Sequence, residues 1–205
     1  RLLPDALNTS EAVFCTNGQQ LELIDEVLGA RNAPPRHNTG NIRFELLGHS
    51  YRDVYTEQAR ALVKKHGDFV LVTTNGKLRN VRDVDKTVLH LHQSLGLNLE
   101  DARKFGTLIE DRAEAQKAFM RDVLAVAAAN PRLRFVLRAK YNEIRPIREL
   151  YAHELPANVK IETEGGIQPW VLSARALVMN NCTTGMDAFA ADTPSLFYYP
   201  EGLNV

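Results

Sequence analysis

The chain lacks net charge, long apolar runs and an opening methionine. It carries 25 Lys and Arg against 25 Asp and Glu in 205 residues. Duplex nucleic acid normally requires a clustered basic face, so we expect no nucleic acid partner. No apolar run approaches the roughly 20 residues of a spanning helix, and no secretory signal opens the sequence. Because the chain begins with Arg1 in a stretch that reads as mid-protein, we expect a segment of a longer protein.

Cysteine and histidine are too scattered to predict a metal site. Cys15 and Cys182, the only two cysteines, form no CxxC pair, so we expect reduced, packed thiols in a cytoplasmic protein. His90 and His92 point the same way only in an extended segment, and no third ligand follows at zinc spacing. We therefore expect no metal ion and no cofactor.

The composition is that of a globular protein, with 44% hydrophobic and 24% charged residues. Apolar residues at helical spacing predict a helix over residues 20–28, and the pair Pro34-Pro35 interrupts the chain after it. We expect residues 1–40 to be the end of one domain with its linker, and residues 41–205 to form a second domain.

From residue 53 onward, helical patterns alternate with short apolar runs typical of strands buried on both faces. The predicted strands are residues 69–73, 133–137, 159–161, 176–179 and 195–199, and the predicted helices are 53–66, 110–129, 169–174 and 184–191. Residues 76–108 give only two weak helical patterns, interrupted by Gly96 and Gly106. The alternation predicts an α/β fold, a doubly wound parallel sheet with helices on both faces.

Such sheets bind ligands outside the carboxyl ends of their strands, so the residues after each strand are the candidates. Thr183, Thr184 and Gly185 lie between a buried strand and a helix. A helix N-terminus binds phosphate readily because its N–H groups lack partners and its dipole favours negative charge. The alternative is that one of the two threonines only caps its own helix.

A neighbouring strand end carries two cations and a carboxylate. Arg138 and Lys140 could clasp a phosphate and Glu143 a ribose, or the three could form an exposed charged loop. The sequence has no GxGxxG, Walker, GxSxG or HExxH motif. The common dehydrogenase, NTPase, hydrolase and metalloprotease interpretations therefore lose support.

Several segments resemble elements of bacterial surface-carbohydrate biosynthesis proteins, the capsule and lipopolysaccharide enzymes of the GT-B glycosyltransferase type. Residues 40–47, GNIRFELL, resemble their GNPR[FY]DLL element, and residues 67–75 look like their first donor-domain strand. Residues 168–177 are similar to PWLLAAxAL, and residues 182–188, CTTGMDA, to a CTTxxEA helix start. The resemblance runs from about Phe14 to the end and is most specific in the last part of the chain.

The resemblance implies the C-terminal, Rossmann-like half of a GT-B fold, which binds a nucleotide-sugar donor and serves sugar transfer to a glycan acceptor in surface polysaccharide assembly. CMP-linked and UDP-linked sugars are both open as donors. By the family pattern, the residues that would hold the donor phosphate are Asn75, Arg138, Lys140, Thr183, Thr184 and Gly185. Those that would contact the ribose are Glu143 and Asp187. The implied location is cytoplasmic, with peripheral association at the inner face of the membrane left open.

One departure from the family pattern leaves other functions open. Residues 138–143 align with an R-P-H-P-x-E element of which only Arg138 and Glu143 remain. Lys140 replaces the histidine and, as a point charge, cannot share its acid–base role near neutral pH. The alternatives are a degenerate domain that binds a nucleotide or a protein partner without turnover, and a sugar-nucleotide epimerase or glycerophosphotransferase of the same fold. No catalytic residue is nominated.

Overall fold

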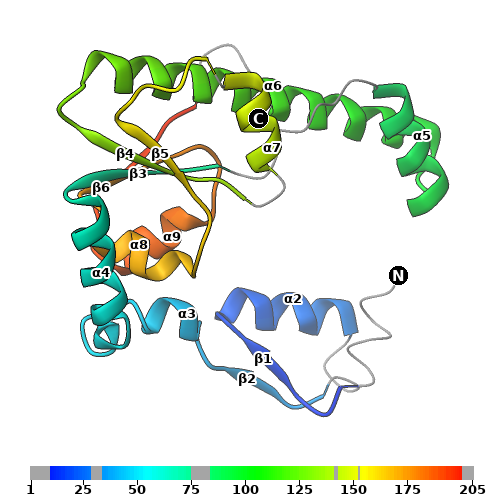
Figure 1. Cartoon of the computed structure of the whole chain (residues 1–205). Helices are drawn as coiled ribbons and strands as arrows, with labels where there is room; N and C mark the ends of the chain where they lie inside the picture. The colour runs from blue at the N-terminus through cyan, green and yellow to red at the C-terminus, as the bar shows by residue number, and fades with distance from the viewer. Residues whose placement is uncertain (1–9, 29–33, 75–83, 141–142, 152, 200–205) are drawn as a thin grey trace. The chain divides into compact units, whose positions relative to one another are not determined.

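The computed structural model describes residues 10–28, 34–74, 84–140, 143–151 and 153–199 of the chain (Figure 1). Two compact units, Arg1–Tyr51 and Arg52–Val205, make up the molecule. The elements of the first unit are β1 (Val13–Cys15), α2 (Gly18–Leu28), β2 (Arg36–Asn38) and α3 (Ile42–Glu45). Strands β1 and β2 pair in parallel, and α2 confirms the helix predicted over residues 20–28. That residues 1–40 are the end of one domain with its linker, and residues 41–205 a second domain, stays a prediction.

The second unit is built on a five-stranded parallel sheet. Its strands are β3 (Phe69–Thr73), β4 (Arg134–Arg138), β5 (Val159–Glu162), β6 (Ala176–Met179) and β7 (Ser195–Phe197). They lie in the order β5-β4-β3-β6-β7, and every pairing is parallel. All the predicted strands are confirmed, with small shifts at their ends.

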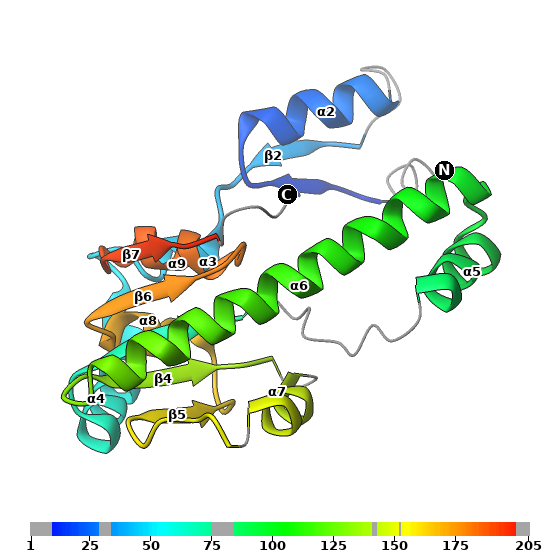
Figure 2. The same cartoon turned by 90° about the horizontal axis from the view of Figure 1, so that it is seen from above.

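Helices cover both faces of this sheet. The helices described in this unit are the 3-10 helix η1 (Arg52–Tyr55), α4 (Thr56–His66), α5 (Val84–Leu95), α6 (Leu99–Ala129), α7 (Ile144–Tyr151), α8 (Ile167–Ser173) and α9 (Thr184–Ala190). Helices α6 and α7 lie on one face, and α4, α8 and α9 on the other, as Figures 1 and 2 show. The unit is therefore the predicted doubly wound α/β domain, with a Rossmann-like strand order.

Strand β3 is central to this core because side chains on both of its faces are buried. On one face Val72 packs with Phe119 and Val123 of α6. On the other face Phe69 meets Trp170 of α8 edge-on, with ring centroids 6.0 Å apart. A strand enclosed on both sides needs no polar alternation, which explains the continuous apolar run in the sequence.

The prediction that the long helix begins at residue 110 was wrong, because α6 begins at Leu99. The side chain of Asn98 caps it by accepting a hydrogen bond from the backbone N–H of Asp101 at 2.8 Å. Gly106 does not interrupt the helix but is buried within it. A glycine inside a helix costs about 1 kcal/mol, which this cap and packing against α5 offset.

Helix α7 was not found in the sequence, and the first residues of the predicted helix 53–66 form η1 instead. Pro146 signals a break when the sequence is read alone. In the structure it lies in the first turn of α7, where a missing N–H removes no intrahelical hydrogen bond.

Replacing Phe119 by Ala tests the core between α6 and the sheet. Phe119 is fully buried, so the cavity left behind should lower the free energy of unfolding by about 3–5 kcal/mol. Urea unfolding measures the change. The matched control is Phe105→Ala on the same helix, where the ring is 50% exposed and the loss should be about 1 kcal/mol or less. Equal losses in the two variants would contradict this assignment of the core.

The environment of His66 makes stability depend on pH. Its buried ring packs against Trp170, with centroids 5.3 Å apart, and burial lowers its pKa. Glu162, with Oε1 3.5 Å from Nε2, raises the pKa in opposition, while Lys65 and Lys160 lower it further. The net pKa lies below the ordinary 6.5. The unfolded chain therefore takes up a proton first, and stability is lost as the pH falls through about 6.5 toward the folded-state pKa.

His66→Gln should remove this part of the acid sensitivity. Urea unfolding at pH 7 and at pH 5 should show a smaller difference in the free energy of unfolding for the variant than for the parent chain. His153→Gln, a matched substitution at an exposed side chain, should keep the parent's difference. An unchanged difference in His66→Gln would show that other groups cause the sensitivity.

Candidate functional site

The strand order creates a topological switch point between β3 and β6. From β3 the chain continues to β4 and β5 on one side, and then returns to β6 and β7 on the other. Open α/β sheets bind ligands outside the carboxyl ends of their strands at such a point. Thr73, the last residue of β3, pairs in register with Arg138 of β4 and with Met179 of β6. The residues that follow these three strands therefore share one edge.

A buried hydrogen-bond cluster joins the ends of β3 and β4. The Thr74 hydroxyl donates to Oε2 of Glu143, and the backbone N–H of Lys140 donates to the same oxygen at 3.3 Å. The N–H of Glu143 in turn donates to the carbonyl of Lys140 at 2.8 Å. Thr74 and Glu143 are buried, while Lys140 is exposed. Lys140 and Glu143, both nominated from the sequence, are thus brought together. The Glu143 side chain links the loop after β4 to β3.

The side chain of Arg138 does not join this cluster but binds the loop after β5. Its Nη1 and Nη2 donate to the carbonyls of Glu164 and Gly165, both at 2.9 Å, and the guanidinium lies 5.2 Å from the ring centroid of Trp170. Burial lowers the pKa of Arg138 and the Glu162 carboxylate raises it, yet an arginine stays cationic. The guanidinium therefore fixes the loop between β5 and α8, and its phosphate contact stays a prediction.

The alternative that Arg138, Lys140 and Glu143 form an exposed charged loop was wrong. Glu143 is fully buried and Arg138 is half-buried, since each takes part in tertiary hydrogen bonds. Only Lys140 of the three is exposed. The element is a structural junction with one cation at its surface.

The start of α9 holds three more nominated residues. Thr183 is the N-cap residue, but its side chain makes no capping hydrogen bond. The buried Thr184 has its Oγ1 3.2 Å from Sγ of Cys182. A Cβ at Gly185 would collide with the thioether of Met179, so the glycine allows α9 to approach β6 closely. The alternative that one of these threonines caps α9 therefore gains no support, since the side chain at the N-cap position makes no capping hydrogen bond.

Both predicted ribose contacts belong to enclosed carboxylates. Asp187 in the first turn of α9 and Glu143 have no exposed surface. Each can support the edge of the sheet from within, and its contact with a ribose stays a prediction. Asn75, nominated for the donor phosphate, lies outside the described residues.

Sequence reasoning missed two buried polar atoms beside the switch point. Among the residues that the structure describes, Thr73 Oγ1 and Asn180 Nδ2 have no hydrogen-bond partner, although their residues are only 2% and 1% exposed. A buried polar atom left unpaired costs about 1–3 kcal/mol, so each atom is a candidate for contact with a ligand. The signal was present in the sequence, because each residue stands at the carboxyl end of a predicted strand.

The comparisons with known proteins add no family. No protein-family model matches the chain, and no curated protein matches it at a significant level. Within the part of the chain that the structure describes, no three His, Cys, Asp or Glu side chains gather as a metal site would require. None of the described helices is both long enough and apolar enough to span a membrane. Cys15 is buried and Cys182 is half-buried.

Thr74→Val tests the junction between β3 and the loop after β4. The variant keeps the volume but takes a hydrogen-bond donor away from the buried carboxylate of Glu143, so the free energy of unfolding should fall by about 1–3 kcal/mol. Thr107→Val, at an exposed threonine whose hydroxyl donates to the Arg103 carbonyl within α6, should change it by about 0.5 kcal/mol or less. Urea unfolding distinguishes the two, and equal small effects would show that the junction contributes little.

Proposed function

We propose that the second unit binds a nucleotide-activated sugar at the carboxyl edge of its sheet, with the nucleotide phosphates beside the switch point between β3 and β6. One observation carries the proposal: Thr73 Oγ1 at the end of β3 and Asn180 Nδ2 just after β6 are buried, and neither has a hydrogen-bond partner within the described part of the chain. Parallel sheets of this order place polar ligands there. A ligand with several hydrogen-bonding groups would supply partners for these two atoms.

Two kinds of group favour phosphate in this site. The exposed Lys140 supplies a cation, and the first turn of α9 supplies backbone N–H groups next to the hydroxyl of Thr183. Cations and N–H donors stabilise the negative charge that grows on a departing phosphate. In a sugar transfer the bond between sugar and phosphate breaks while an acceptor hydroxyl attacks, and these groups would hold the leaving nucleotide.

The resemblance extends the proposal to a glycosyltransferase-type protein of surface polysaccharide assembly, acting on a glycan acceptor in the cytoplasm or at the inner membrane face. The acceptor and the general base would then belong to another part of the protein. The carboxylates of Glu143 and Asp187 are enclosed and shape the site instead of reaching the reacting atoms.

A second candidate is a domain that binds a nucleotide without turnover. The supporting observation is that Arg138 and Glu143, the two residues retained from the family element, are engaged in internal hydrogen bonds. Under this interpretation both side chains serve the scaffold, and the edge binds a nucleotide without catalysing transfer.

Calorimetric titration with CMP, CDP, UDP and GDP tests the proposed site. We expect one nucleotide to bind, and the double variant Thr183→Ala/Thr184→Ala to weaken that binding by about tenfold or more, because both hydroxyls and the local geometry of α9 change. Thr107→Ala on α6 is the control and should bind as the parent does.

Two further outcomes decide between the candidates. Hydrolysis or transfer of the matching nucleotide-sugar would support the transferase, whereas binding with no turnover in the complete protein would support the second candidate. Failure of all four nucleotides to bind a folded chain would overturn both.

A further inference from the structure

A cavity lies at the opposite, amino edge of the same sheet. Its volume is about 580 Å³, within the range of about 300–1,000 Å³ typical of small-molecule pockets. The end of α4, the turn between α6 and β4, and the first residues of β4 and β5 surround it. The lining residues are Lys65, His66, Pro131, Arg132, Arg134, Phe135, Val136, Ala157, Asn158 and Lys160.

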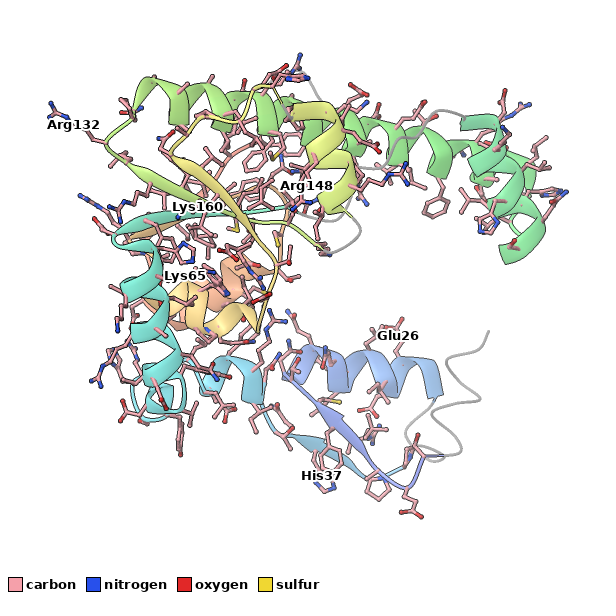
Figure 3. The ribbon with its side chains drawn as sticks, in the orientation of Figure 1. Glu26, His37, Lys65, Arg132, Arg148 and Lys160 are labelled. Atoms are coloured by element: carbon pink, nitrogen blue, oxygen red, sulfur yellow. The ribbon has the colours of Figure 1, made fainter. Side chains whose placement is uncertain are left out.

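The lining is strongly basic in a chain that has no net charge. Four of these ten residues are permanent cations, namely Lys65, Arg132, Arg134 and Lys160, and none is a carboxylate. In Figure 3 the labelled side chains of Lys65, Arg132 and Lys160 come from α4, from the turn between α6 and β4, and from β5. These cations are far apart in the sequence, and the fold brings their positive charges together at this edge.

Internal partners neutralise only part of that charge. Lys65 pairs with Glu162 at 2.8 Å, and Nη1 of Arg134 donates to the carbonyl of His66 at 2.7 Å. Among the residues that the structure describes, no ion pair or hydrogen bond engages the side chain of Arg132 or of Lys160. Two cations beside the cavity are therefore available to an external anion.

Hydrogen bonds from one side chain hold the backbone turn that carries Arg132. Nδ2 of Asn158 donates to the carbonyls of Ala127, Asn130 and Leu133, at 2.9, 3.1 and 2.8 Å. These three carbonyls bracket the turn on which Arg132 stands, and Asn158 directly precedes β5, which carries Lys160. The backbone positions of the two unengaged cations are therefore set by one side chain before any ligand arrives, which lowers the entropic cost of binding.

We propose that this cavity binds an anion that carries phosphate, held by Arg132 and Lys160 with support from Lys65 and Arg134. Arginine's planar fork matches phosphate oxygens and lysine adds a point charge, so the mixture suits a phosphate ligand with several oxygens. The phosphate belongs either to a free phosphorylated molecule or to a phospholipid headgroup. The site is separate from the proposed nucleotide site because it lies at the other edge of the sheet.

Calorimetric titration of the complete protein with inorganic pyrophosphate and tripolyphosphate tests the free form of the ligand. Binding should weaken as salt is added. The double variant Arg132→Ala/Lys160→Ala should weaken it by about tenfold or more, since charge-assisted hydrogen bonds are lost. Both side chains are exposed, so circular dichroism should show that the variant is folded.

Two control variants distinguish binding in this cavity from binding elsewhere on the molecule. Lys104→Ala/Lys117→Ala on α6 removes the same charge from residues that pair locally with Glu100 and Glu114, and it should bind as the parent does. Thr183→Ala/Thr184→Ala should also keep the polyphosphate binding, even if it loses nucleotide. Loss of polyphosphate binding in the threonine variant alone would place the anion at the nucleotide edge and overturn the proposal.

Cosedimentation with vesicles of phosphatidylcholine and phosphatidylglycerol forms the second arm. Binding to these vesicles without binding to soluble polyphosphate, lost in Arg132→Ala/Lys160→Ala, would support the site and assign the phosphate to a lipid headgroup. Binding to soluble polyphosphate, lost in the same variant, would assign it to a free molecule. Binding that the variant leaves unchanged, or no binding in either arm, would overturn the proposal.

Discussion

The fold depends on the enclosure of β3 between two layers of helices. Val72 faces α6, and Phe69 faces Trp170 of α8, so the strand cannot move without opening the core on both sides. Its parallel pairing with β4 and β6 then fixes where those strands end. The polar residues after the three strands are held at one edge by hydrophobic packing several residues away, and the chemistry of that edge is a consequence of the core.

The strands and the fold class follow from local sequence because apolar runs and their spacing are local properties. The long helix α6 and the helix α7 do not, since their signals are overridden by tertiary context. Gly106 weakens the helical pattern where packing against α5 sustains it, and Pro146 suggests a break where the first turn tolerates it. The strand order also lies beyond a single sequence, because it depends on contacts between residues far apart in the chain.

The candidate site shows the same difference between features that local sequence predicts and features that depend on tertiary contacts. That polar residues gather after β3, β4 and β6 could be predicted from their positions at strand ends. The contacts of each side chain could not be predicted, because the partners lie elsewhere in the sequence. Glu143 contacts Thr74, and Arg138 contacts Glu164 and Gly165. A charged residue beside a predicted site can either contact a ligand or form internal hydrogen bonds. Only the tertiary structure shows that these two side chains form internal hydrogen bonds.

The two edges of the sheet differ in a way that bears on how each would select an anion. At the carboxyl edge, buried carboxylates of Glu143 and Asp187 oppose a phosphate, and hydroxyl, amide and backbone donors must outweigh them through directed hydrogen bonds. At the amino edge four cations act through charge, which attracts many anions and discriminates among them poorly. Recognition of a particular nucleotide therefore suits the carboxyl edge, where geometry decides, and retention of a phosphate of broader identity suits the amino edge.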